Sequence, residues 1–144
     1  MLFDNVFLTH RRPGEAITIA DFEAAEAKSG RAIGGGTAVV CWTGCDKEWG
    51  TPGWVKNRPF VPTDSAQWLV DRGITLFATD LIGMDDPSEW WWPTHAIWLR
   101  NGVCMVQQLC RLDRLVGKEF LFVCLPLKMR DGTGCPVRPV ALVM

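Results

Sequence analysis

The sequence predicts an α/β fold, with helices flanking a mixed sheet. Strand-like apolar runs alternate with helix-like segments through the first two thirds of the 144 residues, and strand-like runs dominate the remainder. That order is typical of one layered α/β domain. Because 48% of the residues are apolar, the chain has enough material for a substantial core. We therefore expect a single domain over residues 1–144.

Three helices are expected from the residues at their ends. Thr18 and Asp21 nearly form a capping box, and Gly30 suits the end of the helix that follows them. Thr63 can cap a second helix, and Pro93 suits the first turn of a third. The expected helices cover residues 19–29, residues 64–72 and a segment that begins near residue 93.

Strands are expected where short apolar or β-branched runs lie between turn residues. Three glycines at 34–36 predict a turn and not a phosphate loop, because neither a helix nor a Lys-Ser/Thr ending follows them. The strand after the second helix ends in the carboxylate of Asp80. The long irregular segment 45–62 is a candidate functional loop. The expected strands lie within residues 5–10, 37–43, 74–83, 103–109, 119–128 and 140–144.

Charge and hydropathy argue against several kinds of partner. The formal net charge of -1 gives no reason to expect a nucleic acid or an anionic membrane. No apolar run approaches the roughly 20 residues that a membrane span needs. The start, MLFDNVFLTHRR, lacks the basic-then-apolar order of a signal peptide. We therefore expect a cytoplasmic protein with neither a nucleic-acid nor a membrane partner.

The six cysteines predict neither a disulfide framework nor a zinc site. The sequence has no CxxC pair, and Cys41 and Cys45 are its only close pair. Cys41, Cys104 and Cys124 lie in strand-like runs, where a free thiol behaves as a small hydrophobe. A structural role is therefore expected for these residues.

The most informative segment is WWWPTHAIWLRNGVCMVQQLCRL, residues 90–112. His95, one of only two histidines, follows three tryptophans, and Gln107 comes twelve residues later. Two interpretations of His95 stay open: a side chain packed under an aromatic lid, or a side chain facing a reaction centre. Gln107 can likewise bind a ligand or hydrogen-bond buried backbone groups. Asp80 and Asp85 could add charge, but no spacing argument brings either to His95.

Five stretches occur in this order along the chain: PGEAITIADFEAA, AVVCWTGCDKEWG, AQWLVDRGITLFATD, THAIWLRNGVCMVQQLCRLDRL and FLFVCLPLKMRDGTGCPVRPVAL. Together they resemble the cyclase family of metal-dependent hydrolases, which includes bacterial kynurenine formamidases and isatin hydrolases. The last stretch is similar to the family's C-terminal strand, turn and strand, in which Pro-Leu precedes a Gly-rich turn and Pro-Val-Arg. The matches cover nearly all of the chain.

The resemblance implies a fold, an activity and a site. The fold is a swivelling β/β/α domain, of which this chain would be the C-terminal two thirds, and family members assemble as dimers or higher oligomers. The activity is hydrolysis of ring amides or N-formyl amides with a divalent metal, zinc or manganese. His95 falls on a metal-ligand histidine, and Gln107 on a position that usually holds a ligand glutamate. Trp90, Trp91 and Trp92 would line a pocket for a small aromatic amide, although packing against a neighbouring subunit is an equal alternative.

The sequence departs from the family pattern in two ways. The upstream signature His-x-Gly-Thr-His-x-Asp-x-Pro-x-x-x-His is absent, and Gln107 is neutral where a carboxylate is usual. Two neutral ligands hold a divalent metal poorly, so we expect weak or no metal binding by the isolated chain. One hypothesis is a hydrolase whose catalytic half is truncated or is provided by another chain, in a homo-oligomer or a heteromer with a chain that carries the missing segment. The other is a non-catalytic remnant or an interaction subunit with the same fold.

Overall fold

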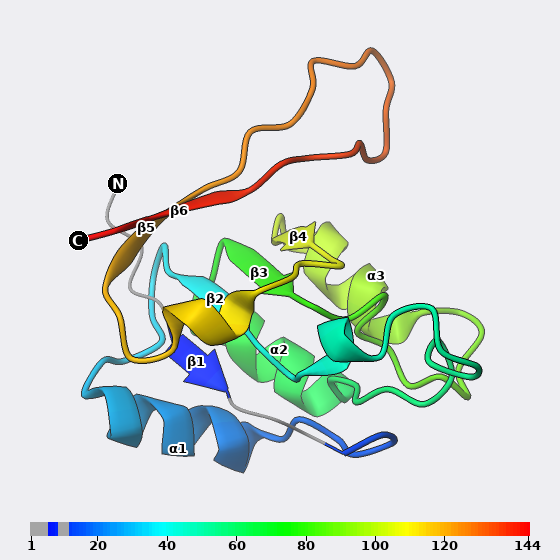
Figure 1. The fold of residues 1–144 in the computed structure, drawn as a ribbon, viewed down its shortest axis with the longest axis horizontal. Helices are drawn as coiled ribbons and strands as arrows, with labels where there is room; N and C mark the ends of the chain where they lie inside the picture. Colours follow the sequence, from blue (N-terminus) through cyan, green and yellow to red (C-terminus); the bar gives the residue numbers. More distant parts are fainter. Residues whose placement is uncertain (1–5, 9–11) are drawn as a thin grey trace.

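The computed structural model describes residues 6–8 and 12–144 of the chain. Its central layer is a parallel sheet with the strand order β1-β2-β3-β4 (Figure 1). β2 pairs with both β1 and β3, and β3 pairs with β4, in each case in parallel register. The strands are β1 (Val6–Leu8), β2 (Ala38–Cys41), β3 (Leu76–Thr79) and β4 (Cys104–Val106).

Each connection between neighbouring parallel strands contains a helix, as parallel pairing requires. The helices are α1 (Ile19–Ser29), α2 (Thr63–Asp71) and α3 (Pro93–Arg100). Two short 3₁₀ helices, η1 (Cys45–Lys47) and η2 (Leu112–Leu115), follow β2 and β4. None of the helices among the described residues is long and apolar enough to cross a membrane.

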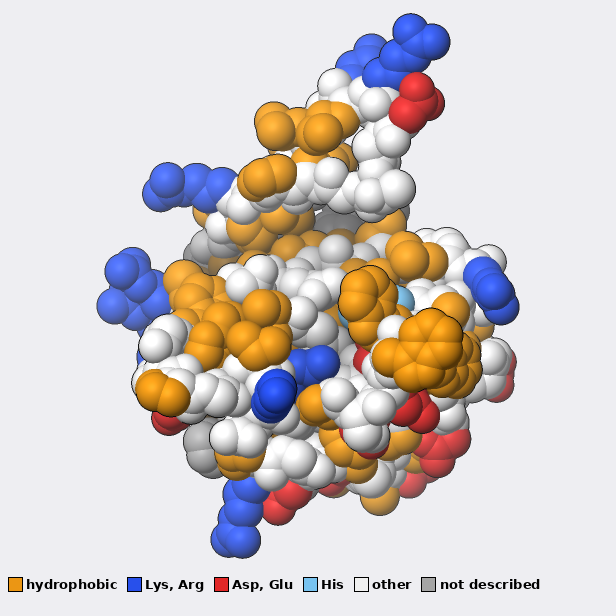
Figure 2. Space-filling view, turned by 90° about the vertical axis from the view of Figure 1, so that its right-hand side faces the viewer, with side chains coloured by type: hydrophobic (Ala, Val, Ile, Leu, Met, Phe, Trp, Pro, Cys, Tyr) orange, Lys and Arg blue, Asp and Glu red, His pale blue; other side chains and the backbone are white. Residues whose placement is uncertain are grey.

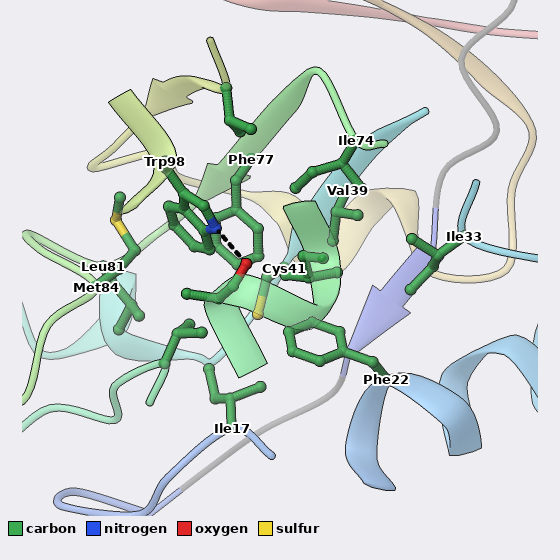
Figure 3. Close-up of a cluster of buried hydrophobic side chains, with 14 of the residues drawn as sticks. Ile17, Phe22, Ile33, Val39, Cys41, Ile74, Phe77, Leu81, Met84 and Trp98 are labelled. Carbon is green, nitrogen blue, oxygen red and sulfur yellow. Dashed lines mark hydrogen bonds between the residues drawn. The ribbon is translucent and has the colours of Figure 1, made fainter. Parts of the chain in front are cut away.

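The central strands β2 and β3 pack against other elements on both faces of the parallel sheet. On one face Val39 and Phe77 pack against side chains of the three helices (Figure 3). These are Phe22 of α1, Leu69 of α2 and Trp98 of α3. On the other face Val40, Ala78 and Val106 pack against Phe120 and Phe122. Neighbouring residues of β2 and β3 therefore point into different cores, which explains why these strands are apolar without alternation.

A separate antiparallel hairpin is formed by β5 (Phe120–Val123) and β6 (Val140–Val143). The residues between these strands extend away from the body of the molecule (Figure 1). We call residues 120–143, the hairpin with its long connecting segment, the arm. Phe120 and Phe122 anchor its base on the parallel sheet.

The predicted α/β class is confirmed, with parallel and antiparallel strands divided between two sheets. The capping box is present, since the Thr18 backbone nitrogen donates to Asp21 Oδ2 at 2.8 Å, and Gly30 ends α1 with φ of 69°. The second helix starts one residue earlier than predicted: Pro62 is the N-cap and Thr63 is already helical. The predicted turn at 34–36 is confirmed by a hydrogen bond from the Thr37 nitrogen to the Gly34 oxygen.

One strand prediction was too long, and another can be compared with the structure over three residues only. The strand expected at 119–128 ends at Val123, because the chain then leaves the sheet and Pro126 cannot donate a ladder hydrogen bond. The strand expected at 5–10 is confirmed over Val6–Leu8, and the rest of it lies outside the described residues. The six cysteines all lie among the described residues and form no disulfide; Cys41 is buried as expected, whereas Cys104 is exposed because the edge strand β4 turns it to solvent.

Candidate functional site

The candidate site lies at the carboxyl ends of β3 and β4. Because these strands pair in parallel, with Ala78 opposite Val106, the segments that follow them leave from the same sheet edge. Gln107 comes directly after β4, and Asp85 lies in the loop after β3. His95 is the third residue of α3, which begins where that loop ends. The topology thus brings together three side chains spread over 23 residues of sequence.

The three side chains form one hydrogen-bonded chain with His95 at its centre. The Nδ1 atom of His95 contacts Oδ2 of Asp85. On the other side of the ring, Nε2 lies 2.9 Å from the amide nitrogen of Gln107. The His95 side chain is 21% exposed and that of Asp85 only 3%. The imidazole therefore stands between a buried carboxylate and a carboxamide, with part of the ring open to solvent.

Backbone donors hold the carboxylate of Asp85. Its Oδ1 atom accepts hydrogen bonds from the backbone nitrogens of Thr94 at 2.7 Å and His95 at 3.2 Å, both in the first turn of α3. Burial acts to raise the pKa of Asp85, but hydrogen bonds and charge at His95, with the Thr94 N–H bond, outweigh it and lower the pKa. Asp85 is therefore an ionised acceptor at neutral pH.

Arg58 fixes the loop that carries Asp85. Its Nη1 atom donates to the backbone oxygens of Gly83 at 2.9 Å and Asp85 at 2.6 Å. Burial lowers the pKa of this guanidinium, whereas the charge of Asp85 acts to raise it. Arg58 belongs to the long 45–62 segment, which the sequence marked as a candidate functional loop. That segment therefore supports the site by holding the loop of Asp85.

The three tryptophans before α3 lie on the surface. Trp90 is 87% exposed, Trp91 58% and Trp92 63%. Trp92 is the residue before the helix, with a positive φ of 52°, and its ring centroid lies 6.0 Å from that of His95. Figure 2 shows large hydrophobic side chains gathered on the face below the arm. Trp92 thus borders the imidazole, while all three rings are open to contact from outside.

Asp80 is not part of this group. It is fully buried, and its Oδ1 atom accepts from the backbone nitrogen and the hydroxyl of Thr43, both at 2.9 Å. Its Oδ2 atom accepts from the backbone nitrogen of Asp46 at 3.3 Å. Burial raises the pKa of Asp80 in spite of these bonds, which act to lower it. Asp80 therefore joins the ends of β2 and β3, and Asp85 is the carboxylate that meets His95.

The donor chemistry at His95 and Gln107 fits part of a divalent metal site. An imidazole nitrogen and an amide oxygen are both known ligands, and a carboxylate on the second ring nitrogen is the usual support of a metal-bound histidine. Within residues 6–8 and 12–144, no group of three or more His, Cys, Asp or Glu side chains is placed to hold a metal by itself. The described residues thus offer two side chains of a kind that can ligate a metal, with a carboxylate behind one of them.

The comparisons with known proteins identify the family. The family model for putative cyclases matches residues 3–86. The chain belongs to this cyclase family. It is 30% identical over 142 residues to the isatin hydrolase of Roseibium aggregatum, a match that covers 91% of this chain and 54% of the relative. It is 28% identical over 82 residues to the kynurenine formamidase of Bacillus mycoides, covering 57% and 39% of the two chains.

Solved structures agree with this assignment. A crystal structure of an isatin hydrolase bound to the product analogue thioisatinate matches with a TM-score of 0.86 at 26% identity, covering 99% of this chain and 60% of that one. A potential metal-dependent hydrolase with cyclase activity has the same fold, with a TM-score of 0.76 at 24% identity over 96% and 63% of the two chains. The chain spans about half the length of the isatin hydrolase relative. The predicted family and fold are confirmed.

Sequence reasoning found two of the three grouped side chains. His95 and Gln107 were identified through the family resemblance, and their side chains meet in the structure. Asp85 lies ten positions before His95 across an irregular loop, so no spacing in the sequence brings the two together. A buried Asp that accepts from a helix N-terminus is a recognisable signal only when it lies next to that helix in sequence.

Proposed function

We propose that this chain supplies part of the metal site of an amide hydrolase. The observation that carries the proposal is the meeting of His95 and Gln107, backed by the ionised Asp85. An isatin hydrolase and a kynurenine formamidase are among the relatives that match the chain, which supports a hydrolytic reaction at the family level. The substrate would be a cyclic amide or an N-formyl amide of an aromatic compound.

His95 and Gln107 would hold the metal through Nε2 and the carboxamide oxygen. Zinc and manganese both suit this pair, because imidazole and neutral oxygen donors favour neither strongly. A catalytic site normally has at least three protein ligands, so the set would be completed by residues outside the described ranges, on this polypeptide or on another chain. A divalent cation there would lower the pKa of a bound water and polarise the amide carbonyl.

The chain's own residues would orient the reaction. Asp85 would hold the His95 ring so that Nε2 faces Gln107, and Arg58 would hold the loop of Asp85. Trp92, next to His95, would offer one face to a planar substrate, because an aromatic amide gains from stacking on an indole ring. The exposed Trp90 and Trp91 would become part of such a pocket when a second surface covers them.

The test combines metal binding with turnover. Zn²⁺ and Mn²⁺ binding is measured by calorimetry, and hydrolysis of isatin and N-formylkynurenine by absorbance, for wild type, His95→Ala and Gln108→Ala. We expect His95→Ala to lose at least about 100-fold in metal affinity and turnover, because it removes a ligand. Gln108, exposed and next to Gln107, is the matched control and should keep both. The variants are compared in the protein or assembly that carries the completed ligand set, and a wild-type assembly that neither binds metal nor turns over either amide contradicts the proposal.

We propose a second candidate function, self-association through the arm, because its apolar side chains are exposed. Burying one aliphatic side chain removes on the order of 100 Å² of apolar surface. At their observed exposures the six side chains offer roughly 350 Å² of apolar surface. That is a little under half of the roughly 800 Å² that one partner of a stable dimer contributes, so the set would form the apolar part of such an interface. A groove of about 550 Å³ runs along the arm, lined mainly by apolar residues between Val123 and Val140. The exposed set is Leu125, Leu127, Met129, Val140, Leu142 and Val143.

The proposed occupant of this surface is a second copy of the chain. A lone two-stranded hairpin is marginally stable in water, and β5 and β6 pair only with each other among the described strands. In a two-fold symmetric dimer, the arm of each copy would pack on the body of the other in an isologous contact. The arm carries Lys128, Arg130 and Arg138 but only Asp131 as an acid within 124–139, and the whole chain is net negative. Charge therefore favours contact between the arm and the body of the second copy.

Sedimentation equilibrium tests this pairing. Wild type should be a dimer, and the double variant Leu125→Asp/Leu127→Asp should be a monomer with unchanged circular dichroism. Val55→Asp is the matched control, since Val55 is an exposed apolar residue of the 45–62 segment. A monomeric wild type, or a complex that forms only with a different polypeptide, would exclude pairing of two copies.

A further inference from the structure

The hydrogen bonds around His95 define which ring nitrogen carries the proton. An ionised carboxylate only accepts hydrogen bonds, so Nδ1 of His95 must donate to Asp85. On the other side, the amide nitrogen of Gln107 only donates, so Nε2 must carry a lone pair. Both contacts are satisfied by one form of the ring, the neutral tautomer with its proton on Nδ1.

We infer that Asp85 is a positioning residue that holds His95 in the Nδ1–H tautomer and leaves the lone pair of Nε2 facing Gln107. Three contacts fix the carboxylate in place, namely two backbone N–H groups of α3 on Oδ1 and the ring on Oδ2. Because Oδ1 is already occupied by backbone donors, Oδ2 is the atom left to receive the imidazole. The carboxylate is 3% exposed, so water competes little for it.

The same geometry assigns Gln107 two alternative roles. With its amide nitrogen toward Nε2, Gln107 caps the lone pair through which an imidazole binds a metal. A half-turn about the last side-chain bond of Gln107 exchanges nitrogen and oxygen, and such sp³–sp² torsions are soft. After that rotation the carboxamide oxygen, a metal ligand, occupies the place of the capping N–H. This second role rests on the proposed metal site, whereas the tautomer does not.

The substitution Asp85→Asn is expected to move the ring proton of His95 from Nδ1 to Nε2. The single side-chain oxygen of an asparagine is needed by the backbone N–H groups of Thr94 and His95, so its amide N–H₂ group faces Nδ1. Nδ1 must then accept, and the ring proton moves to Nε2. Gln107 turns its oxygen to this new N–H. Asp85→Asn is therefore expected to change the tautomer of His95 with little change in the shape of the site.

Nitrogen-15 NMR of the imidazoles tests the inference directly. In the wild-type chain at mildly alkaline pH, His95 should show a protonated Nδ1 and an unprotonated Nε2, with assignment by a His10→Gln variant. In Asp85→Asn, His95 should instead show an unprotonated Nδ1 and a protonated Nε2. Asp86→Asn is the matched control, because Asp86 accepts from Ser88 instead and its loss of charge is the same. A wild-type ring protonated on Nε2 overturns the inference even if Asp85→Asn does not fold.

A Zn²⁺ titration monitored by the same spectra separates the two claims. Zn²⁺ alone should perturb the Nε2 resonance of wild type, and Asp85→Asn should bind it about 10- to 100-fold more weakly because its Nε2 carries a proton. If the tautomer is as inferred but Zn²⁺ leaves Nε2 unchanged, the proposed metal site fails and the positioning role of Asp85 stands. If the wild-type tautomer is the opposite one, the positioning role fails whatever Zn²⁺ does.

Discussion

Asp85 accepts hydrogen bonds from both the backbone nitrogen and the imidazole Nδ1 of His95. The first bond ties the carboxylate to the start of α3, and the second sets the direction of the ring. One residue therefore links the loop after β3, the helix and the candidate site. Removing the charge of Asp85 should therefore affect the stability of the fold as well as the chemistry of the candidate site.

The first prediction concerns acid unfolding through Asp85. Its pKa is lowered in the folded state, so the unfolded chain binds more protons and stability rises with pH in that range. The contribution is present above the unfolded value near 3.8 and is lost as pH falls through the lower folded pKa. Urea unfolding over a pH series should show that Asp85→Asn loses less free energy of unfolding at acid pH than wild type does. Asp86→Asn should keep the wild-type slope, and equal slopes in all three proteins would contradict the prediction.

The second prediction has the opposite sign and concerns Asp80. Burial raises the pKa of this carboxyl, so the folded chain binds more protons than the unfolded chain and stability falls as pH rises from 3.8 to the folded pKa. Asp80→Asn should remove this fall. The variant should still cost about 1–3 kcal/mol at low pH, since its amide cannot accept from the Asp46 nitrogen. Chemical denaturation at several pH values measures both effects, and an unchanged slope would count against the ionisation of Asp80.

The third prediction concerns the core beneath the site. Trp98 of α3 is fully buried, donates from Nε1 to the Ala66 oxygen at 3.1 Å and lies 4.5 Å from Phe77 between ring centroids (Figure 3). Trp98→Ala should cost about 3–5 kcal/mol, because it leaves a cavity and removes the side-chain hydrogen bond to the Ala66 carbonyl. The exposed Trp90→Ala should change stability by no more than about 0.5 kcal/mol. Similar urea midpoints for the two variants would contradict this packing.

Much of the fold could be predicted from local signals, as α1 shows. Thr18, Asp21 and Gly30 encode both ends of that helix within a few residues, so no tertiary information was needed. The strand expected beyond Val123 shows the limit. An apolar run has no local mark of where its partner strand ends, and the exposed Leu125 and Leu127 resemble core residues in sequence.

The site was predictable only where resemblance supplied distant information. The pair His95 and Gln107 is separated by a helix and a turn, and the family pattern connects them across that gap. Asp85 reaches His95 through an irregular loop whose path depends on Arg58, a residue 27 positions earlier. No periodicity describes such a loop, so the contact follows from tertiary structure alone.

The last prediction tests Gln107 as the residue that departs from the family pattern. Gln107→Glu places a carboxylate at the position that already faces Nε2 of His95, 2.9 Å from the present amide nitrogen. An ionised ligand attracts a divalent cation more than a neutral amide does, and a charged contact contributes about 1.5–3 kcal/mol, so Zn²⁺ should bind at least about tenfold more tightly. Gln108→Glu adds the same charge on an exposed neighbour and should raise the affinity far less. Calorimetric titration with Zn²⁺ compares the variants. Equal gains in Zn²⁺ affinity from both would mean that the new carboxylate at position 107 acts only through the net charge of the chain and that residue 107 does not bind the metal.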